Sequence, residues 1–358
     1  MLCYLTTIEA KLYNSIDQCW REDPNWGAKR QRLADCAKGF GASAQGGKNG
    51  AEYVVTDPSD DPENPKFGTL RYGVIQTEPL WITFQTDMNI VLEEELLVNS
   101  YKTIDGRGAQ IRIGDGPCIR VAKVSHVIIH GLTIENCQKH KSGPARWVDN
   151  RKRSDGDGIR VLRSNNIWID HCRLSSCKDG LIDVSLSSTY ITISNNYFSN
   201  HRKVMLLGHS DKFLRDVNMK VTVAFNYFGP ELVSRMPRAR FGSFHVANNR
   251  YEKWLQYAIG GSMNPTILSE GNHFDAPDNP DAKEVTWKKI KKGGDRGERW
   301  SWTSKGDAFL NGAYFNGSGI PWEPDYTQTQ YFAAAPAHEV VELTQDAGPL
   351  QCDPTQGC

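Results

Sequence analysis

The stretch YITISNNYFSNH (190–201) alternates β-branched with other residues and then places an asparagine before an aromatic residue. Such alternation is typical of a β-strand with one buried face. Similar stretches recur as VSHVIIHGLTIENC (124–137), NNIWIDHCRLSSC (165–177), KVTVAFNYFG (220–229), SFHVANNRYEKW (243–254) and NPTILSEGNHFDAP (264–277). A pattern that returns roughly every 20 to 40 residues indicates structural units that stack on one another.

The asparagines of this repeat indicate how the units stack. Asn196, Asn226, Asn249 and Asn272 are separated by 30, 23 and 23 residues. Asparagine tolerates the left-handed backbone of a tight turn, and stacked copies can hydrogen-bond to one another. A helical signal between the strands is nearly absent, which excludes βαβ layers and TIM barrels. We therefore predict an all-β fold, a single-stranded right-handed parallel β-helix or solenoid, with structural asparagines.

The N-terminal region differs from the repeat. A solenoid needs a cap over the open end of its core. Residues 24–38 predict an N-terminal capping helix, with Asp23 as its N-cap and Pro24 in its first turn. Its apolar face would carry Trp26, Leu33, Ala34 and Ala37.

The remaining boundaries follow from where the repeat begins and fades. The glycine-rich segment 39–50 is predicted to be a flexible connector. We expect a single domain over residues 1–358, with cap and connector at about 16–50. The coils would occupy residues from about 51 to 277. Residues from about 278 to 358 would form loops and a C-terminal segment that packs on the outside of the solenoid.

Charge and hydropathy exclude several classes of function. Lys plus Arg and Asp plus Glu number 42 each, so no global field recruits nucleic acid. No apolar run approaches the roughly 18 residues that a membrane span needs. The first residues, MLCYLTTIEAKLYNSIDQC, make a poor signal peptide, which leaves open a missing or truncated native signal.

The nine cysteines contain no CxxC pair, which argues against a zinc ribbon. An oxidising compartment would allow local disulfides, whereas buried free thiols are the alternative reading. The odd count leaves at least one cysteine unpaired, with Cys3 as the candidate. The candidate local bridges are Cys19/Cys36, Cys118/Cys137 and Cys352/Cys358. Asn316-Gly317-Ser318 is a glycosylation sequon and fits secretion.

Four aspartates form the first candidate site. Asp155 and Asp157 lie two residues apart in SDGDGI, so a strand would point both carboxylates the same way. Asp179 and Asp183 flank GLI in KDGLIDV, and the two pairs can converge if the coils stack. Oxygen-only clusters favour hard cations, and Ca²⁺ best tolerates irregular geometry. Aspartates beside glycines are also common in turns and helix caps.

Arginines in RMPRAR (235–240) form the second candidate site, together with Lys203. Guanidinium groups bind carboxylates in a bidentate manner. Arg238 and Arg240 would share one face of a strand. The alternative reading is a set of surface salt bridges.

These motifs together resemble the polysaccharide lyase family 1 pectate lyases. The chain is most similar to the plant branch that includes the major pollen allergens of ragweed, mugwort, cedar and cypress. The matching segments run from about residue 16 to 274 and include IDQCWREDPNW, DGRGAQIRI, SDGDGI, IWIDHC, DGLIDV, KVMLLGHSD, RMPRARFG and YAIGGS. The resemblance implies calcium-dependent cleavage of de-esterified polygalacturonate by β-elimination, giving 4,5-unsaturated oligogalacturonides.

The resemblance also implies roles for single residues. Asp157, Asp179 and Asp183 would be primary Ca²⁺ ligands, and Asp155 an accessory ligand. Arg235 would be the Brønsted base, which favours alkaline pH because a guanidinium must first lose its proton. Lys203 and Arg240 would hold the galacturonate carboxylate. Asp170 and His171 match a buried structural motif. A secreted, monomeric cell-wall protein that binds neither membrane nor nucleic acid is expected, and allergenicity is suggested by resemblance alone.

Two other functions compete with this reading. A polygalacturonase is also a β-helix, but hydrolysis needs paired carboxylates as acid and base, whereas the acids here are better explained as metal ligands. A catalytically weak wall-polysaccharide-binding homologue could keep the fold and the calcium site. The retained Arg235, Lys203 and Arg240 argue against it.

Overall fold

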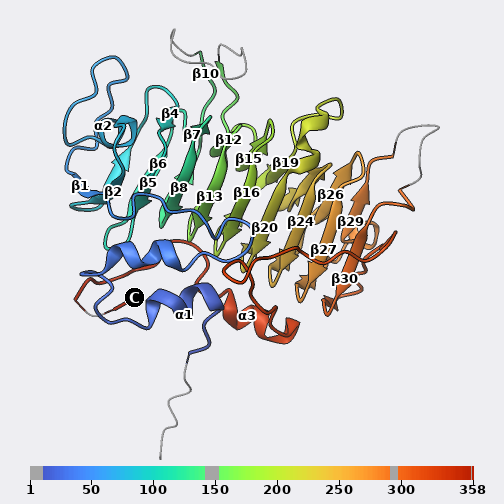
Figure 1. Ribbon diagram of the computed structural model, residues 1–358. Helices are drawn as coiled ribbons and strands as arrows, with labels where there is room; N and C mark the ends of the chain where they lie inside the picture. Colours follow the sequence, from blue (N-terminus) through green and yellow to red (C-terminus); the bar gives the residue numbers. More distant parts are fainter. Residues whose placement is uncertain (1–10, 142–152, 291–296, 356) are drawn as a thin grey trace, which may run out of the picture.

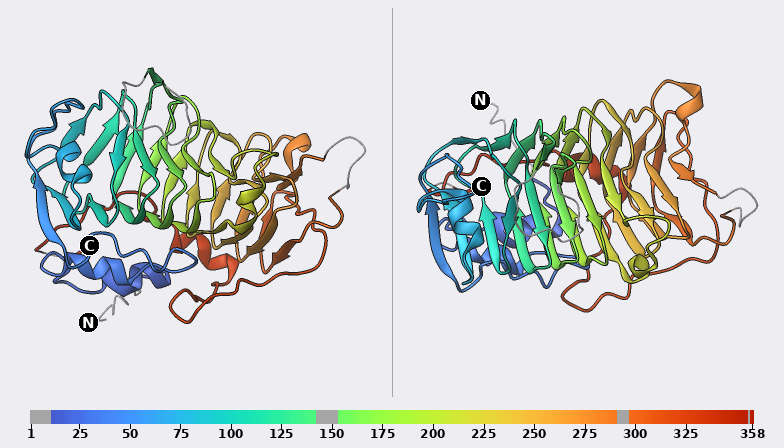
Figure 2. Two further views of the ribbon diagram at one scale, coloured as in Figure 1. Left: turned by 45° about the horizontal axis from the view of Figure 1, so that its top comes forward. Right: turned by 90° about the horizontal axis from the view of Figure 1, so that it is seen from above.

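The computed structural model describes residues 11–141, 153–290, 297–355 and 357–358. The described chain winds into stacked coils, each of which contributes short strands to parallel sheets (Figure 1). This confirms the predicted parallel β-helix. Figure 2 shows the coils as a continuous row along the long axis of the molecule.

The largest sheet in the described residues has ten strands, paired in parallel in the order in which they occur. These strands are β1 (Ala51–Val55), β2 (Leu80–Phe84), β5 (Lys102–Asp105), β8 (Ser125–His130), β13 (Asn165–Asp170), β16 (Thr189–Ser194), β20 (Lys220–Ala224), β24 (Ser243–Ala247), β27 (Thr266–Glu270) and β30 (Trp302–Lys305).

Two further parallel sheets complete the coils. The eight-stranded sheet contains β4 (Leu96–Val98), β7 (Ile119–Ala122), β12 (Ile159–Leu162), β15 (Ile182–Ser185), β19 (Met205–Leu207), β23 (Arg238–Arg240), β26 (Ile259–Ser262) and β29 (Thr286–Lys288). The nine-stranded sheet contains β3 (Met88–Ile90), β6 (Ile111–Gly114), β9 (Leu132–Glu135), β14 (Arg173–Ser175), β17 (Tyr197–Ser199), β21 (Tyr227–Phe228), β25 (Arg250–Glu252), β28 (His273–Asp275) and β31 (Ala308–Leu310).

Shorter elements lie outside these sheets. Two-stranded pairs are formed by β10 (His140–Lys141) with β11 (Arg153–Ser154), and by β18 (His201–Lys203) with β22 (Leu232–Ser234). The helices are α1 (Ser15–Arg21), α2 (Leu70–Ile75) and α3 (Val340–Leu343), with 3₁₀ turns η1 (Arg30–Asp35), η2 (Leu214–Asn218), η3 (Pro280–Ala282) and η4 (Ala337–Glu339).

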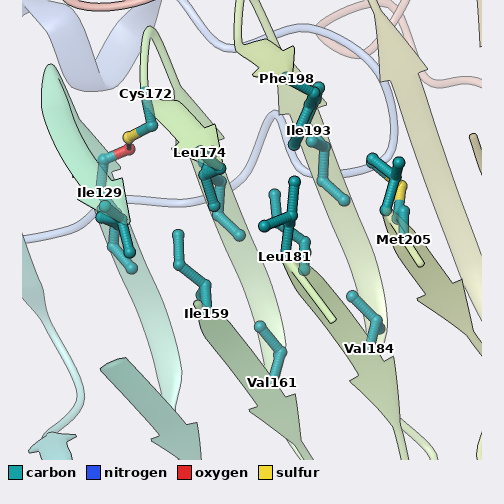
Figure 3. Packing of buried hydrophobic residues seen from close by; sticks show 14 of the residues in the cluster. Ile129, Ile159, Val161, Cys172, Leu174, Leu181, Val184, Ile193, Phe198 and Met205 are labelled. Atoms are coloured by element: carbon teal, nitrogen blue, oxygen red, sulfur yellow. Dashed lines mark hydrogen bonds between the residues drawn. The ribbon is translucent and has the colours of Figure 1, made fainter. Parts of the chain in front are cut away.

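The interior of the solenoid is one continuous apolar cluster. Every second strand residue points inward, so that Ile159 and Val161 of β12 stack beside Ile182 and Val184 of β15. Figure 3 shows Ile159, Val161 and Val184 in the interior with Ile129 of β8 and Leu174 of β14, so that side chains from all three sheets meet there. Burial of this apolar surface is the main stabilising contribution to the fold.

The asparagine ladder is confirmed. The side-chain oxygen of Asn226 accepts from the backbone nitrogen of Asn196 at 2.9 Å, and Asn249 does the same for Asn226 at 3.0 Å. Asn272 continues the series toward Asn249 at 2.8 Å. All four asparagines are fully buried, so the ladder satisfies backbone groups that water cannot reach.

Replacing Asn226 by alanine should lower the free energy of unfolding by about 2–4 kcal/mol, because the buried Asn196 amide would lose its acceptor. The carbonyl of Ile193 would lose its donor as well. Urea unfolding followed by tryptophan fluorescence measures the change. Asn165→Ala is the matched control, since Asn165 is exposed and accepts only from its neighbour's side chain. Equal losses in both variants would contradict the ladder's role.

The helix predicted at 24–38 is wrong in position. The N-terminal helix is α1, and Asn14 caps it by accepting from the backbone nitrogens of Ile16 and Asp17 at 3.0 and 3.1 Å. Residues 24–29 form turns that lead into η1. The predicted apolar face is nevertheless buried, because Trp26 and Leu33 pack on the outer face of the ten-stranded sheet, against side chains such as Trp168.

The end of the solenoid core is covered by another helix. Leu70 and Val74 of α2 belong to the interior cluster, and α2 contacts β1, β2 and β4. Figure 1 shows α2 at this end of the row of coils. The N-terminal segment therefore runs along the side of the solenoid, whereas α2 closes its end.

The glycine-rich segment 39–50 is a fixed strap and not a flexible connector. Its backbone nitrogens donate to outward threonines of the ten-stranded sheet: Gly41 to Thr192 and Gly47 to Thr103, both at 2.9 Å. A Cβ at Gly47 would lie only 1.9 Å from the Leu80 carbonyl oxygen. Glycine is needed here because the two backbones approach so closely.

The C-terminal part of the chain continues the solenoid further than the sequence repeat indicates. Strands β29, β30 and β31 extend all three sheets beyond residue 277. After them, Phe332 and Cys352 pack on the outer face of the ten-stranded sheet, as predicted for this segment.

The predicted disulfides Cys19–Cys36, Cys118–Cys137 and Cys352–Cys358 are present. Cys172 and Cys177 are buried free thiols, and Cys3 lies outside the described residues.

Candidate functional site

The four aspartates lie on adjacent coils of the eight-stranded sheet. Asp155 and Asp157 precede β12, and Asp179 precedes β15. Asp183 lies within β15 between two inward residues, so its side chain points outward and pairs in register with Arg160 of β12. Alternation along the strand therefore places Asp183 outside the core while its neighbours fill it.

Asp157 and Asp183 meet at Gly180. The Gly180 backbone nitrogen donates to Asp157 Oδ1 at 2.7 Å. A Cβ built at Gly180 would lie 2.3 Å from Asp183 Oδ1 and 3.2 Å from Asp157 Oδ1. Glycine at this position therefore leaves room for two carboxylates on one side of the backbone.

This arrangement disfavours the ionised carboxylates. Burial raises the pKa of Asp157 to about 6, with further contributions from the charges of Asp179 and Asp155. The hydrogen bond from Gly180 and the charge of Arg160 oppose the rise. Burial, followed by the charges of Asp157 and Asp179, raises the pKa of Asp183 well above its ordinary value. Asp183 keeps some exposed surface, but protein surrounds it on most sides.

The cluster is short of positive charge. Lys203 Nζ lies 2.7 Å from Asp179 Oδ1, and Arg160 lies 3.6 Å from both Asp155 and Asp157. Across the described residues, no three His, Cys, Asp or Glu side chains converge into a ready-made metal shell. The donor set still fits a hard cation, because neighbouring carboxylates with raised pKa values gain from one between them.

Arg235 lies at the edge of this cluster. It follows β22 and adopts a left-handed backbone, with φ of 68°. Its carbonyl oxygen accepts from the Met205 backbone nitrogen at 2.7 Å, which fixes the turn against β19. Its charge opposes the rise in the pKa of Asp183, after the larger opposing effect of Arg160.

Arg240 lies two strands from Asp183 on the same sheet. Its Nε donates to Asp211 Oδ1 at 3.0 Å and its Nη1 to the Gly208 carbonyl at 2.8 Å. Asp211 also accepts from Ser262 Oγ at 2.8 Å. Burial by itself would raise the pKa of Asp211, but the hydrogen bonds from Ser262 and Arg240 lower this pKa below its ordinary value. The guanidinium of Arg240 is therefore held in place.

Arg238 and Arg240 share the outer face of β23, as predicted, because Ala239 between them is in the core. The structure thus brings Asp157 and Asp183 to Gly180, pairs Asp179 with Lys203, and links Asp155 to Asp157 through Arg160. It places Arg235 on a turn beside β19 and Arg240 two strands from Asp183. Sequence reasoning missed three positions: Arg160, Gly180 and Asp211. Only Arg160 carried a signal, since it lies between the apolar Ile159 and Val161 on an alternating strand, which places its side chain on the outer face.

Comparisons with known proteins all find similarity to pectate lyases. The pectate lyase family model matches residues 91–305. Probable pectate lyase 16 of Arabidopsis thaliana is 56% identical over 360 residues, covering 99% of this chain and 91% of that protein. A pectate lyase of Zinnia elegans is 53% identical over 350 residues, covering 96% of this chain and 87% of that protein.

Solved structures agree on the fold. The crystal structure of Jun a 1, the major allergen from cedar pollen, is 51% identical with a TM-score of 0.91, covering 94% of this chain and 99% of that one. A pectate lyase of Bacillus sp. N165, crystallised with trigalacturonate, is 22% identical with a TM-score of 0.66. The alignment covers 88% of this chain and 98% of the bacterial chain, and the similarity between the two is one of fold.

Proposed function

Because this chain belongs to the pectate lyase family, we propose that it cleaves de-esterified (1→4)-α-D-galacturonan by β-elimination and requires Ca²⁺. The observation that carries this proposal is the meeting of Asp157 and Asp183 at Gly180, with Arg235 on a turn that hydrogen-bonds to the adjacent strand β19. The expected products are 4,5-unsaturated oligogalacturonides.

The acids would hold the metal ion. Asp157, Asp179 and Asp183 are the proposed primary ligands, and Asp155 an accessory one. Bound Ca²⁺ would supply positive charge to the galacturonate carboxylate, whose negative charge grows as the reaction proceeds. The raised pKa values of Asp157 and Asp183 support this assignment, since a cation would relieve their mutual repulsion.

The chain's cations would carry out the remaining steps. Arg235, in its neutral form, would accept the C5 proton, which is weakly acidic because it is α to a carboxylate. The C–H electron pair becomes the C4–C5 double bond while the C4–O bond breaks. The glycosidic oxygen leaves with that bond's electrons and takes a proton from water. Lys203 and Arg240 would hold the sugar carboxylate during proton transfer.

We also propose that the protein acts outside the cell, on wall polygalacturonate, as a monomer. The three disulfides support an oxidising compartment. None of the described helices has the length and apolar character to cross a bilayer.

Purified protein mixed with polygalacturonate should form an ultraviolet-absorbing unsaturated product, and EDTA should stop its formation until Ca²⁺ is restored. The reason is that a double bond conjugated with a carboxylate absorbs, whereas a hydrolysis product does not. The initial rate of absorbance increase measures the activity.

New reducing ends without absorbance would contradict the proposal and favour a hydrolase. Binding of the polymer without either signal, with Ca²⁺ present, would favour a catalytically weak wall-binding protein.

A further inference from the structure

The outer face of the eight-stranded sheet continues beyond the acids toward the C-terminal end of the solenoid. Asp183 pairs in register with Leu206, and the line then passes through Arg238 and Gly260 to Trp287. Figure 1 shows β15, β19, β26 and β29 following one another along the row of coils. Four strand spacings of about 4.8 Å separate Asp183 from Trp287 by about 19 Å.

Trp287 is an exposed aromatic side chain held rigidly from below. Trp287 is 39% exposed to solvent. The Tyr257 ring stacks on it at 5.1 Å with an interplanar angle of 14°, and the Arg238 guanidinium lies 5.5 Å from its ring centre. A Cβ at Gly260 would lie 2.4 Å from the Tyr257 ring, so this glycine makes room for the stack. A preorganised indole offers a flat apolar surface at little entropic cost.

The path between the acids and Trp287 is cationic. Arg238 is only 8% exposed, and within the described chain its Nε and Nη2 have no hydrogen-bond partner. Arg240, which is ion-paired with Asp211, lies beside it on β23, and exposed Lys289 directly follows β29. The two arginines and Lys289 outnumber this one carboxylate. An anionic polymer leaving the acid cluster along this face would therefore remain next to positive charge.

The character of the surface changes past Trp287. A cavity of about 330 Å³ opens beside its ring, and Trp287 itself, Glu284, Glu298 and Lys288 are among the lining residues. Among these lining residues the two carboxylates outnumber the one lysine, so a polyanion is attracted less strongly past the indole.

We propose that Trp287, stacked on Tyr257 and supported by Arg238, is a distal subsite that binds one pyranose ring of a galacturonan chain extending from the acid cluster. The inference rests on the proposed function for the identity of the polymer. Trp287 contacts the sugar, and Arg238 is a positioning residue that also contributes charge. A chain must span about 19 Å to touch both ends. We expect trigalacturonate, which has only three pyranose rings, to be too short to reach Trp287 when it is bound at the acids.

Trp287→Ala should therefore lower kcat/KM about three- to tenfold on polygalacturonate, through KM, and leave the value on trigalacturonate unchanged. Trp287→Phe should restore most of the loss, because an aromatic surface remains. Equal losses on both substrates would overturn the proposal, since a structural defect does not depend on chain length.

Phe309→Ala is the matched control. Phe309 is 38% exposed at the same end of the solenoid and stacks on Phe274 at 5.6 Å, but it lies on the nine-stranded sheet. The control should keep wild-type values on both substrates. A polymer-specific loss in Phe309→Ala equal to that of Trp287→Ala would overturn the subsite.

Electrophoresis through a gel containing polygalacturonate and EDTA measures binding without turnover, because the proposed cleavage requires Ca²⁺. Wild-type protein and Phe309→Ala should be retarded more than Trp287→Ala. This result separates the two proposals, because a wild-type protein that makes no unsaturated product yet shows Trp287-dependent retardation retains the subsite while the lyase function fails. Equal retardation of all three proteins would overturn the subsite.

Discussion

Arg235→Ala should lower kcat on polygalacturonate about 10³-fold or more while leaving KM nearly unchanged. Proton transfer by a positioned side chain contributes about 10²- to 10⁴-fold, and Arg235 is the proposed acceptor. Its charge opposes the rise in the pKa of Asp183, and its backbone is fixed by the Met205 hydrogen bond. Alanine and arginine are similarly strained at a φ of 68°, so the fold should survive the change. Formation of unsaturated product at saturating substrate measures kcat.

Arg202→Ala provides the control for loss of charge. Arg202 is exposed on β18, directly before Lys203, so its removal subtracts the same charge from the same region. We expect its kcat to stay within about twofold of wild type. Arg235→Ala protein with more than a tenth of wild-type kcat would contradict the assignment of Arg235 as the base.

The coils and the asparagine ladder could be predicted because both repeat. A residue such as Asn226 meets its counterpart one coil away whatever the details of the connecting loops. The outward placement of Arg238 and Arg240 was predictable for the same reason, since strand alternation alone sets it. Local periodicity is therefore enough to predict which way a side chain points and which residue it stacks on, wherever one coil is stacked on the next.

The N-terminal helix shows where periodicity is insufficient. Asp23 and Pro24 form a strong helix-start signal, yet the helix begins after Asn14. Tertiary contacts decide the outcome: Asp17 receives hydrogen bonds from His171 and Arg21, and Trp20 packs on the outer face of the ten-stranded sheet. No local pattern reveals partners that lie more than 150 residues apart in the sequence.

The site shows the same limit. The acids were recognisable as neighbours in sequence, but Gly180 as their meeting point depends on how one loop crosses the next coil. Asp211 orients Arg240 from a separate loop, through a contact that spans two strands of the sheet. Residues that position a functional side chain are set by inter-coil geometry, which the sequence does not display.

Asp157→Asn should abolish Ca²⁺-dependent turnover and, in the same protein, stabilise the metal-free fold at neutral pH by up to about 3 kcal/mol. Activity falls because a neutral amide is a poor calcium ligand. Stability rises because the substitution removes a charge that burial and the charges of Asp179 and Asp155 disfavour. The asparagine oxygen can still accept from the Gly180 nitrogen.

The direction of this effect with pH follows from the pKa of Asp157, which folding raises from 3.8 to about 6. Between these values the folded protein binds more protons than the unfolded chain, so wild-type stability in EDTA falls as pH rises from about 4 to about 6. The penalty is fully present above that range and absent below about pH 4. The stabilising effect of Asp157→Asn should therefore appear at pH 7 and vanish near pH 4 in urea unfolding.

Asp278→Asn is the matched control, because Asp278 is exposed and accepts a hydrogen bond from Asn311 that an amide oxygen can replace. It should change neither activity nor stability at either pH. Asp183→Asn should behave like Asp157→Asn, since the same two causes raise the pKa of its carboxyl. If Asp157→Asn lost activity but destabilised the metal-free protein at pH 7, the acids would be structural partners of Arg160. A gain in stability together with loss of turnover is expected if burial and mutual repulsion destabilise the ionised carboxylates in the metal-free protein. A bound cation would relieve the same repulsion, which favours binding of the ion at this site.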